Sequence, residues 1–373
     1  MALAYTNAPA LPGIRSRFAD NGNGLTMHFL EAGFEEPGRP LVVLLHGFPE
    51  LAYSWRKVMP ALAEAGYWVV APDQRGYGRT LGWNPSYDGD LAESRVMNLV
   101  RDVMGLMQAL GRDEAHAVVG HDFGAMVAAW AALLRPDVFR RCCIMSAPFS
   151  GPPSLSAAKP ASNIHADLAA LERPRKHYHW YYWTRWANED MWRAPQGMHD
   201  FLRGYFHQKS ADWKQNKPFP LAAWTAEELA KMPTYYIMDL SESMPETVAR
   251  EMPTAAEIAA CEWMPDAEMA IFATEYGRTG FQGGLQWYRA NQGGAFNAEL
   301  QVFSGRTIDV PFTFISGASD WGIHQRPGAL ERMERQACTD VRGVHLVDGA
   351  GHWVQQEQPQ AVLSHLLPFL ATA

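Results

Sequence analysis

Short apolar strands alternate with helical patterns in the first 147 residues, and this alternation restricts the possible folds more than any other feature of the chain. Strands are predicted at residues 41–45, 68–71, 116–120 and 141–146, after a hairpin formed by residues 14–20 and 25–32. Helices are predicted over residues 91–110 and 123–134, where apolar residues recur at helical spacing. The repeated unit predicts an α/β fold with a mostly parallel sheet covered by helices on both faces.

The alternation stops near residue 148 and returns after residue 300. The segment between these points is rich in aromatic residues and helical stretches, with many Pro breaks. Strands at 311–316 and 344–347, with helices at 326–336 and from 359 onward, then restore the first pattern. The sequence therefore predicts one core made of residues 1–147 and 301–373, interrupted by an inserted, mainly helical cap (lid) domain, residues 148–300.

Charge and composition exclude several kinds of partner. The 373 residues carry 32 Lys and Arg against 40 Asp and Glu, so the net charge of −8 provides no basic field for nucleic acid or an anionic membrane. The chain has no run of 18 apolar residues and no leader-like N-terminus. Its four cysteines show no metal-type spacing. We expect a cytoplasmic monomer or homodimer that acts on a small neutral molecule.

The strongest local signal is the pentapeptide Gly120-His121-Asp122-Phe123-Gly124, which joins a predicted strand to an Ala-rich helix. Small residues on both sides of a central nucleophile are typical of the strained turn that exposes that side chain at the top of a sheet. Asp122 stands where many hydrolases carry Ser. The other interpretation is that Asp122 only caps the following helix, a common role for Asp.

A second signal follows the strand at 41–45, where His46-Gly47-Phe48-Pro49 resembles a segment that supplies one backbone donor of an oxyanion hole. The donor in this chain is the amide of Phe48. The amide of Phe123, at a helix N-terminus, is the expected second donor. The two segments lie one strand–helix unit apart, which is a much rarer arrangement than either turn alone.

The third signal lies in the C-terminal part, where Asp320 and His352 follow the last two predicted strands. This gives the chain order nucleophile, acid, histidine. Asp309 and Asp348 are rival acids, but Asp309 precedes its strand and Asp348 is only four residues from His352. We therefore predict a triad of Asp122, Asp320 and His352.

Taken together, these segments make the chain resemble an epoxide hydrolase of the α/β-hydrolase superfamily. The matching segments occur in the expected order and span most of the chain. They are His46-Gly47-Phe48-Pro49-Glu50, Ser54-Trp55-Arg56, Asp73-Gln74-Arg75-Gly76-Tyr77-Gly78, the pentapeptide around Asp122, residues 280–289 and Gly351-His352-Trp353.

The resemblance implies two lid tyrosines that hold the epoxide oxygen. Tyr288 in Trp287-Tyr288-Arg289 matches the second closely. The first belongs to the run Tyr178-His179-Trp180-Tyr181-Tyr182, where Tyr178 fits best and a shifted match selects Tyr181 or Tyr182. Among the aromatic residues of these segments, we expect Trp55, Trp180, Tyr181 and Trp353 to contact the substrate.

The implied chemistry uses no metal or organic cofactor. Asp122 attacks an apolar epoxide to form an alkyl ester, the tyrosines donate to the departing oxygen, and water activated by His352 and Asp320 releases a vicinal diol. A haloalkane dehalogenase is less favoured because Phe123 offers no indole N–H for a halide. A fluoroacetate dehalogenase is less favoured because residues 123–134 contain no arginine, although His179-Trp180-Tyr181 resembles its fluoride pocket. A non-catalytic ligand-binding protein is the remaining alternative.

Overall fold

A central sheet of eight strands organises the computed structural model, which describes residues 11–155 and 163–372. The strand order is β1-β2-β4-β3-β5-β6-β9-β10, with β1 and β2 antiparallel to their neighbours and the rest parallel. The strands are β1 (Ile14–Asp20), β2 (Thr26–Ala32), β3 (Leu41–Leu45), β4 (Trp68–Pro72), β5 (Ala117–His121), β6 (Cys142–Met145), β9 (Phe312–Gly317) and β10 (Val341–Val347). The predicted mostly parallel sheet is confirmed. The N-terminal residues 1–10, expected to lack a leader, lie outside the described residues.

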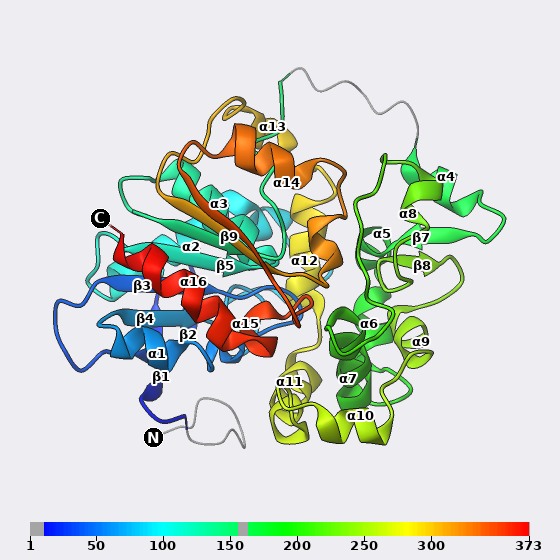
Figure 1. Ribbon diagram of the computed structural model, residues 1–373, viewed down its shortest axis with the longest axis horizontal. Coiled ribbons are helices and arrows are strands. Elements are labelled where there is room, and N and C mark those ends of the chain that lie inside the picture. The colour runs from blue at the N-terminus through cyan, green and yellow to red at the C-terminus, as the bar shows by residue number, and fades with distance from the viewer. Residues whose placement is uncertain (1–10, 156–162, 373) are drawn as a thin grey trace.

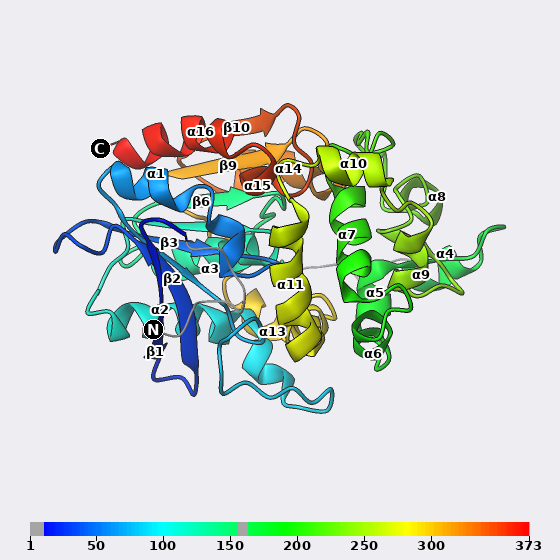
Figure 2. The ribbon, with the colours of Figure 1, turned by 90° about the horizontal axis from the view of Figure 1, so that it is seen from below.

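Helices cover both faces of this sheet, as Figures 1 and 2 show. On one face lie α2 (Val96–Ala109) and α3 (Phe123–Leu134), and on the other α1 (Met59–Glu64) and α16 (Pro359–Ala371). The apolar residues of α2 recur at helical spacing and are buried against the sheet, as are those of α3. Burial on two faces explains why β3 and β5 read as continuous apolar runs.

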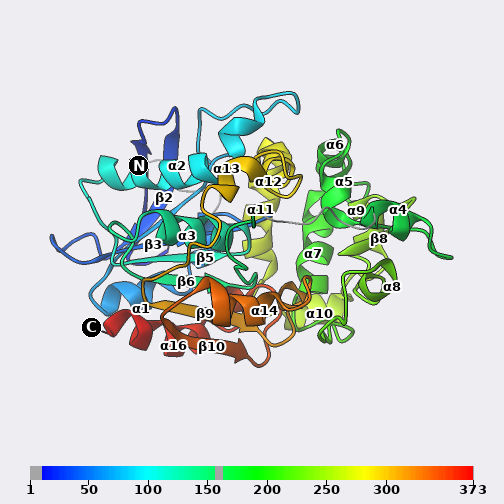
Figure 3. The ribbon, with the colours of Figure 1, turned by 90° about the horizontal axis from the view of Figure 1, so that it is seen from above.

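A second, mainly helical layer lies beside one end of the sheet (Figure 1). Its elements are α4 (Ile164–Ala169), α5 (Tyr178–Tyr182), α6 (Ala187–Trp192), α7 (Met198–Lys209), α8 (Ala226–Leu229), α9 (Met244–Ala249), α10 (Ala255–Ala260), α11 (Asp266–Thr279) and α12 (Gln282–Asn291). The next helix, α13 (Asn297–Gln301), lies on the side of the sheet, near α3 (Figures 1 and 3). The helical layer also holds a two-stranded ladder, β7 (Arg175–His177) with β8 (Ile237–Asp239). Three residues are too few to show alternation, so this ladder was not predicted.

The remaining helical elements are short. The predicted helix at 326–336 begins only at α14 (Ala329–Arg332), because Gly328 is left-handed, and continues as the π-turn η4 (Met333–Ala337). The others are η1 (Ala52–Trp55), η2 (Leu91–Ser94), η3 (Trp321–Ile323) and α15 (Val354–Glu357). No helix of the described residues is both long and apolar enough to cross a membrane.

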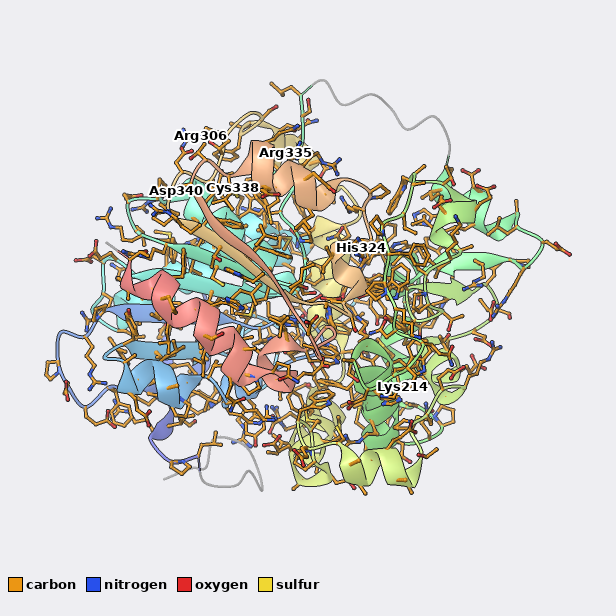
Figure 4. The ribbon with its side chains drawn as sticks, in the orientation of Figure 1. Lys214, Arg306, His324, Arg335, Cys338 and Asp340 are labelled. Carbon is orange, nitrogen blue, oxygen red and sulfur yellow. The ribbon has the colours of Figure 1, made fainter. Side chains whose placement is uncertain are left out.

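The carboxyl ends of the parallel strands point toward the helical layer. Figure 4 shows this with two labelled residues: Asp340, just before β10, lies at the far end of the sheet, whereas His324, after β9, lies on the side of the helical layer. Seen from above in Figure 3, α12 and α14 lie at the junction of the two layers. Loops that follow β3, β5, β6, β9 and β10 therefore converge at this junction, where ligands bind in open α/β sheets.

Candidate active site

The turn between β5 and α3 holds Asp122 in a strained backbone conformation, with φ of 52°. Neighbouring glycines permit it: a Cβ on Gly124 would lie 2.1 Å from the Leu45 carbonyl oxygen, and one on Gly120 would lie 2.1 Å from that of Gly124. Asp122 makes no side-chain capping hydrogen bond to α3. The turn therefore presents the carboxylate away from the helix, which argues against a simple capping role.

The Asp122 carboxylate lies against the loop after β3. Its Oδ1 accepts a hydrogen bond from the Phe48 amide at 2.9 Å. A Cβ on Gly47 would lie 2.4 Å from the Asp122 Cβ, so only glycine permits this approach. The Phe123 amide makes no hydrogen bond to the carboxylate here, but it is the first N–H of a twelve-residue helix. One predicted donor thus contacts Asp122, and the second lies next to it in the chain.

His352 lies between the two predicted carboxylates. Its Nε2 is 3.5 Å from Asp122 Oδ2, and its Nδ1 is 3.2 Å from Asp320 Oδ1. The Ser146 hydroxyl, which sequence reasoning missed, is 2.8 Å from the same Nδ1. The rival acids Asp309 and Asp348 are both exposed. The structure therefore brings the three predicted triad residues together, with Ser146 as an additional partner of the imidazole.

The opposite charges of these residues favour the ionised form of each. Burial opposes ionisation of Asp122, but the hydrogen bond and charge of His352 outweigh it and hold the pKa of Asp122 well below its usual range. Burial would lower the pKa of His352, but the charge of Asp320 and the hydrogen bond to Asp122 outweigh it and raise the pKa to about 9. At neutral pH the free site therefore holds an imidazolium between two carboxylates.

Glu50 connects the loops on which these groups stand. Its Oε2 accepts a hydrogen bond from the Gly47 amide at 2.9 Å and contacts the imidazole of His121. The other ring nitrogen of His121 lies 2.6 Å from the His352 carbonyl oxygen. Gln355, just past His352 in the chain, donates to Glu50 Oε1 at 2.8 Å. This buried network holds the loops after β3, β5 and β10 in one arrangement.

A cavity of about 490 Å³ opens in front of Asp122. Its wall includes Tyr178, the first residue of α5, and Tyr288 of α12. The hydroxyl of Tyr181 instead donates to Asp190, that of Tyr182 pairs with Tyr205, and neither residue lines the cavity. Of the three candidates for the first lid tyrosine, the structure brings only Tyr178 to the cavity that contains Asp122.

The four aromatic residues expected to contact the substrate lie outside this cavity lining. Trp55 is fully buried in the core, and Trp353 stacks on Phe206. Trp180 is 38% exposed, and the Tyr181 hydroxyl points to Asp190. This placement does not support their predicted role, because their rings pack into the protein or face outward. Other aromatic and apolar side chains replace them: Met126, Trp130, Phe149 and His179.

The spacing of two of these residues was a usable signal. Met126 and Trp130 follow Asp122 at intervals of four residues along α3, so they lie on the helix face that carries the nucleophile turn. Phe149 belongs to the loop after β6 and had no such signal. The cavity wall therefore continues down α3, whereas the sequence analysis expected substrate contacts from Trp55, Trp180, Tyr181 and Trp353.

Close backbone contact positions the helix that carries Tyr288. A Cβ on Gly283 of α12 would lie 2.1 Å from the Gly76 carbonyl oxygen in the loop after β4. We expect Gly283→Ala to displace α12 and to lower the free energy of unfolding by about 1–3 kcal/mol, measured by urea denaturation. Gly277→Ala in α11 is the matched control, because nothing lies within 4 Å of its added Cβ. Equal stability of the two variants would contradict this packing argument.

The chain is similar to known proteins both in sequence and in fold. The family model described as alpha/beta hydrolase fold matches residues 40–202. Epoxide hydrolase A of Mycobacterium tuberculosis is 33% identical over 359 residues, which cover 93% of this chain and 95% of the relative. The structure of potato (Solanum tuberosum) epoxide hydrolase I superposes with a TM-score of 0.72 at 29% identity, covering 96% of this chain and 99% of that one. Epoxide hydrolase A from Mycobacterium thermoresistibile gives a TM-score of 0.72 at 32% identity, covering 96% and 98%.

Proposed function

The chain belongs to the epoxide hydrolases of the α/β-hydrolase fold, and we propose that it converts an apolar epoxide to a vicinal diol through a covalent ester on Asp122. One observation carries this mechanism. The Asp122 carboxylate contacts His352 on one side, and the cavity in front of it is lined by Tyr178 and Tyr288. We further propose that the described residues of the segment 148–300 act as the lid over a core made of residues 1–147 and 301–373.

The first half of the reaction is nucleophilic ring opening. An Asp122 oxygen forms a bond to one epoxide carbon while the C–O bond to that carbon breaks. The pKa values of Tyr178 and Tyr288 lie well above the ordinary value, because of burial and of nearby groups that include Asp122. Both phenols therefore stay protonated and donate to the oxygen as it becomes an alkoxide. A proton drawn from the site, ultimately that of the His352 imidazolium, completes the hydroxyl group of the ester.

The second half is hydrolysis of that ester. His352, now neutral, takes a proton from a water molecule that attacks the Asp122 carbonyl carbon. The amides of Phe48 and Phe123 stabilise the tetrahedral oxyanion, and Asp320 stabilises the imidazolium. Collapse breaks the bond from this carbon to the alcohol oxygen, which takes the second proton of the attacking water and leaves as part of the diol. Asp122 returns as a carboxylate and His352 as an imidazolium, so each turnover consumes only the epoxide and water.

No observation favours a dehalogenase. Phe123, the residue after the nucleophile, has no N–H to offer a halide. His179 lines the cavity, but Trp180 is directed away from it, so the run that resembles a fluoride pocket is not assembled there. The direct test is an assay of aryl and alkyl epoxides beside bromoalkanes, chloroalkanes and fluoroacetate. Diol without halide is expected, and halide without diol would overturn the proposal.

The effect of the lid tyrosines on ring opening can be measured separately from ester hydrolysis. Tyr178→Phe and Tyr288→Phe each remove one donor to the alkoxide, so we expect each to slow ester formation by about 10²–10³-fold. Rapid-quench measurement of the first half-reaction checks this. Tyr181→Phe is the matched control, because its hydroxyl contacts Asp190 and should leave that rate within about threefold of the unmodified protein. A larger loss in Tyr181→Phe than in Tyr178→Phe would assign the first lid tyrosine to residue 181.

A further inference from the structure

Lys209 joins the helical layer to the loop that carries His352. It is the last residue of α7 and is only 3% exposed. Its carbonyl oxygen accepts the backbone N–H of His352 at 2.8 Å. A Cβ on Gly351 would lie 2.4 Å from this oxygen, so glycine permits the contact. The backbone of Lys209 therefore lies directly against the histidine loop.

The Lys209 side chain ends among aromatic rings. Among the described residues, no carboxylate lies within ion-pair distance of its ammonium group. Five ring centroids lie 4.8–6.0 Å from Nζ, those of Tyr178, Tyr205, Tyr235, Tyr236 and Trp353. Aromatic faces attract a cation, but this attraction offsets only part of the free-energy cost of removing the cation from water. A buried ammonium without a carboxylate partner weakens the fold, which suggests a role in the chemistry.

The charge of Lys209 reaches the catalytic groups. Burial lowers its pKa to about 8, against the opposing effect of Asp122, Asp320 and Glu50, so the ammonium form predominates at neutral pH. In turn, the Lys209 charge is among the causes that lower the pKa values of Asp122 and His352. The titratable groups that surround Lys209 and His352 are Asp122, Asp320, Glu50, His121, Glu357, Tyr178, Tyr205, Tyr235 and Tyr236.

We propose that Lys209 is a positioning residue for ester hydrolysis, whose positive charge favours the neutral, proton-accepting form of His352 once Asp122 has become an ester. The inference rests on the two-step reaction proposed above. In the free site, the charges of Asp122 and Asp320 attract the His352 imidazolium, and the charge of Lys209 repels it. Ester formation removes the Asp122 charge, so one carboxylate fewer opposes the repulsion by Lys209. Loss of the His352 proton to the epoxide oxygen relieves this repulsion and creates the base that hydrolysis requires.

These charges set the protonation state of His352 before and after ester formation. Before the substrate reacts, the Asp122 charge holds His352 as an imidazolium, so the histidine cannot activate water prematurely. After the substrate reacts, Lys209 is the remaining cation near the imidazole. Without Lys209, the repulsion that helps burial to oppose the attraction of Asp320 would be lost, and the imidazole would stay protonated to a higher pH.

The test compares Lys209→Met with Lys209→Arg, because methionine removes the charge with little loss of length and arginine keeps it. Ester formation and ester decay are followed by rapid quench and intact-protein mass between about pH 6 and pH 9. In Lys209→Met, we expect the acid limb of ester decay to move up by about one pH unit, which is an about tenfold slower decay near pH 7. Lys209→Arg is expected to keep the acid limb of the unmodified protein.

A merely structural role gives a different result. If Lys209→Met slows decay equally at every pH, with its acid limb unmoved, the inference is wrong. Lys209→Gln, followed in the same way, replaces the methionine variant if that protein does not fold. Absence of any ester in the unmodified protein would overturn the proposed two-step reaction, and this inference with it, whereas a normal ester with an unmoved limb would overturn the inference alone.

Discussion

We expect Asp122→Asn to abolish turnover, with kcat/KM lowered by more than about 10⁴-fold. The change keeps the size of the side chain and an oxygen that can accept the Phe48 N–H. It removes the negative charge, and a neutral amide oxygen is a far weaker nucleophile toward a saturated carbon. Steady-state diol assays measure the loss. Intact-protein mass after incubation with epoxide should show no adduct.

Asp348→Asn is the matched control for this prediction, because Asp348 is an exposed acid close to His352 in the chain. We expect it to keep the activity of the unmodified protein within about twofold. Circular dichroism of both variants separates loss of chemistry from loss of fold. Diol formation by Asp122→Asn at more than about one hundredth of the normal rate would contradict the role of Asp122 as nucleophile.

We expect His352→Gln to stop the reaction after ester formation. The nucleophile is ionised without help from a base, and Tyr178 and Tyr288 can still donate to the departing oxygen. Water can supply the hydroxyl proton that His352 gives in the unmodified protein, so we expect ring opening to survive. Ester decay loses its general base, and we expect it to slow by about 10²–10⁴-fold. Intact-protein mass should therefore show a stable adduct equal to the mass of the epoxide, and peptide mapping should locate it on Asp122.

The matched control for this variant is Ser146→Ala, which removes a neighbour of His352 Nδ1 and keeps the base itself. Its ester should decay within about tenfold of the normal rate, and no adduct should persist. A His352→Gln protein that releases diol as fast as the unmodified one would show that another group activates the water. An adduct on any residue other than Asp122 would contradict the assignment of the nucleophile.

Much of the fold could be predicted from periodicity alone. The strands β3, β5 and β6 are buried on both faces, so their apolar runs and the helices between them identify a parallel sheet. Short strands that pair with distant segments were harder to predict. The ladder of β7 and β8 pairs residues that lie 60 to 64 positions apart in the chain, and neither strand shows alternation. Only the packing of the helical layer brings them together.

The three triad residues could also be predicted from the sequence, because each follows the end of a predicted strand. Asp122, Asp320 and His352 follow β5, β9 and β10, and parallel strands bring such loops to one edge. The cavity wall was not readable in the same way. The run around Tyr178 is aromatic at nearly every position, so its composition does not say which ring faces Asp122. The contacts of Trp180 and Tyr181 are set by distant residues.

Lys209 shows the same limit more sharply. A lysine at the end of a helix is ordinarily a solvated residue that favours the negative end of the helix dipole. Its burial results from rings on three separate segments, around Tyr178, Tyr235 and Trp353, that approach one another only in the folded chain. No residue spacing in the sequence predicts that these three segments come together around Lys209. The helix end therefore looked unremarkable until the surrounding aromatic rings were placed.

A single-turnover reaction in water labelled with oxygen-18 tests the covalent mechanism most directly. With enzyme in excess over epoxide, we expect the first diol to carry no label, because the oxygen it gains comes from the Asp122 carboxylate. The label should instead appear in the peptide that contains Asp122. Labelled diol in that first turnover, with an unlabelled Asp122 peptide, would show direct attack of water on the epoxide and would contradict the covalent ester.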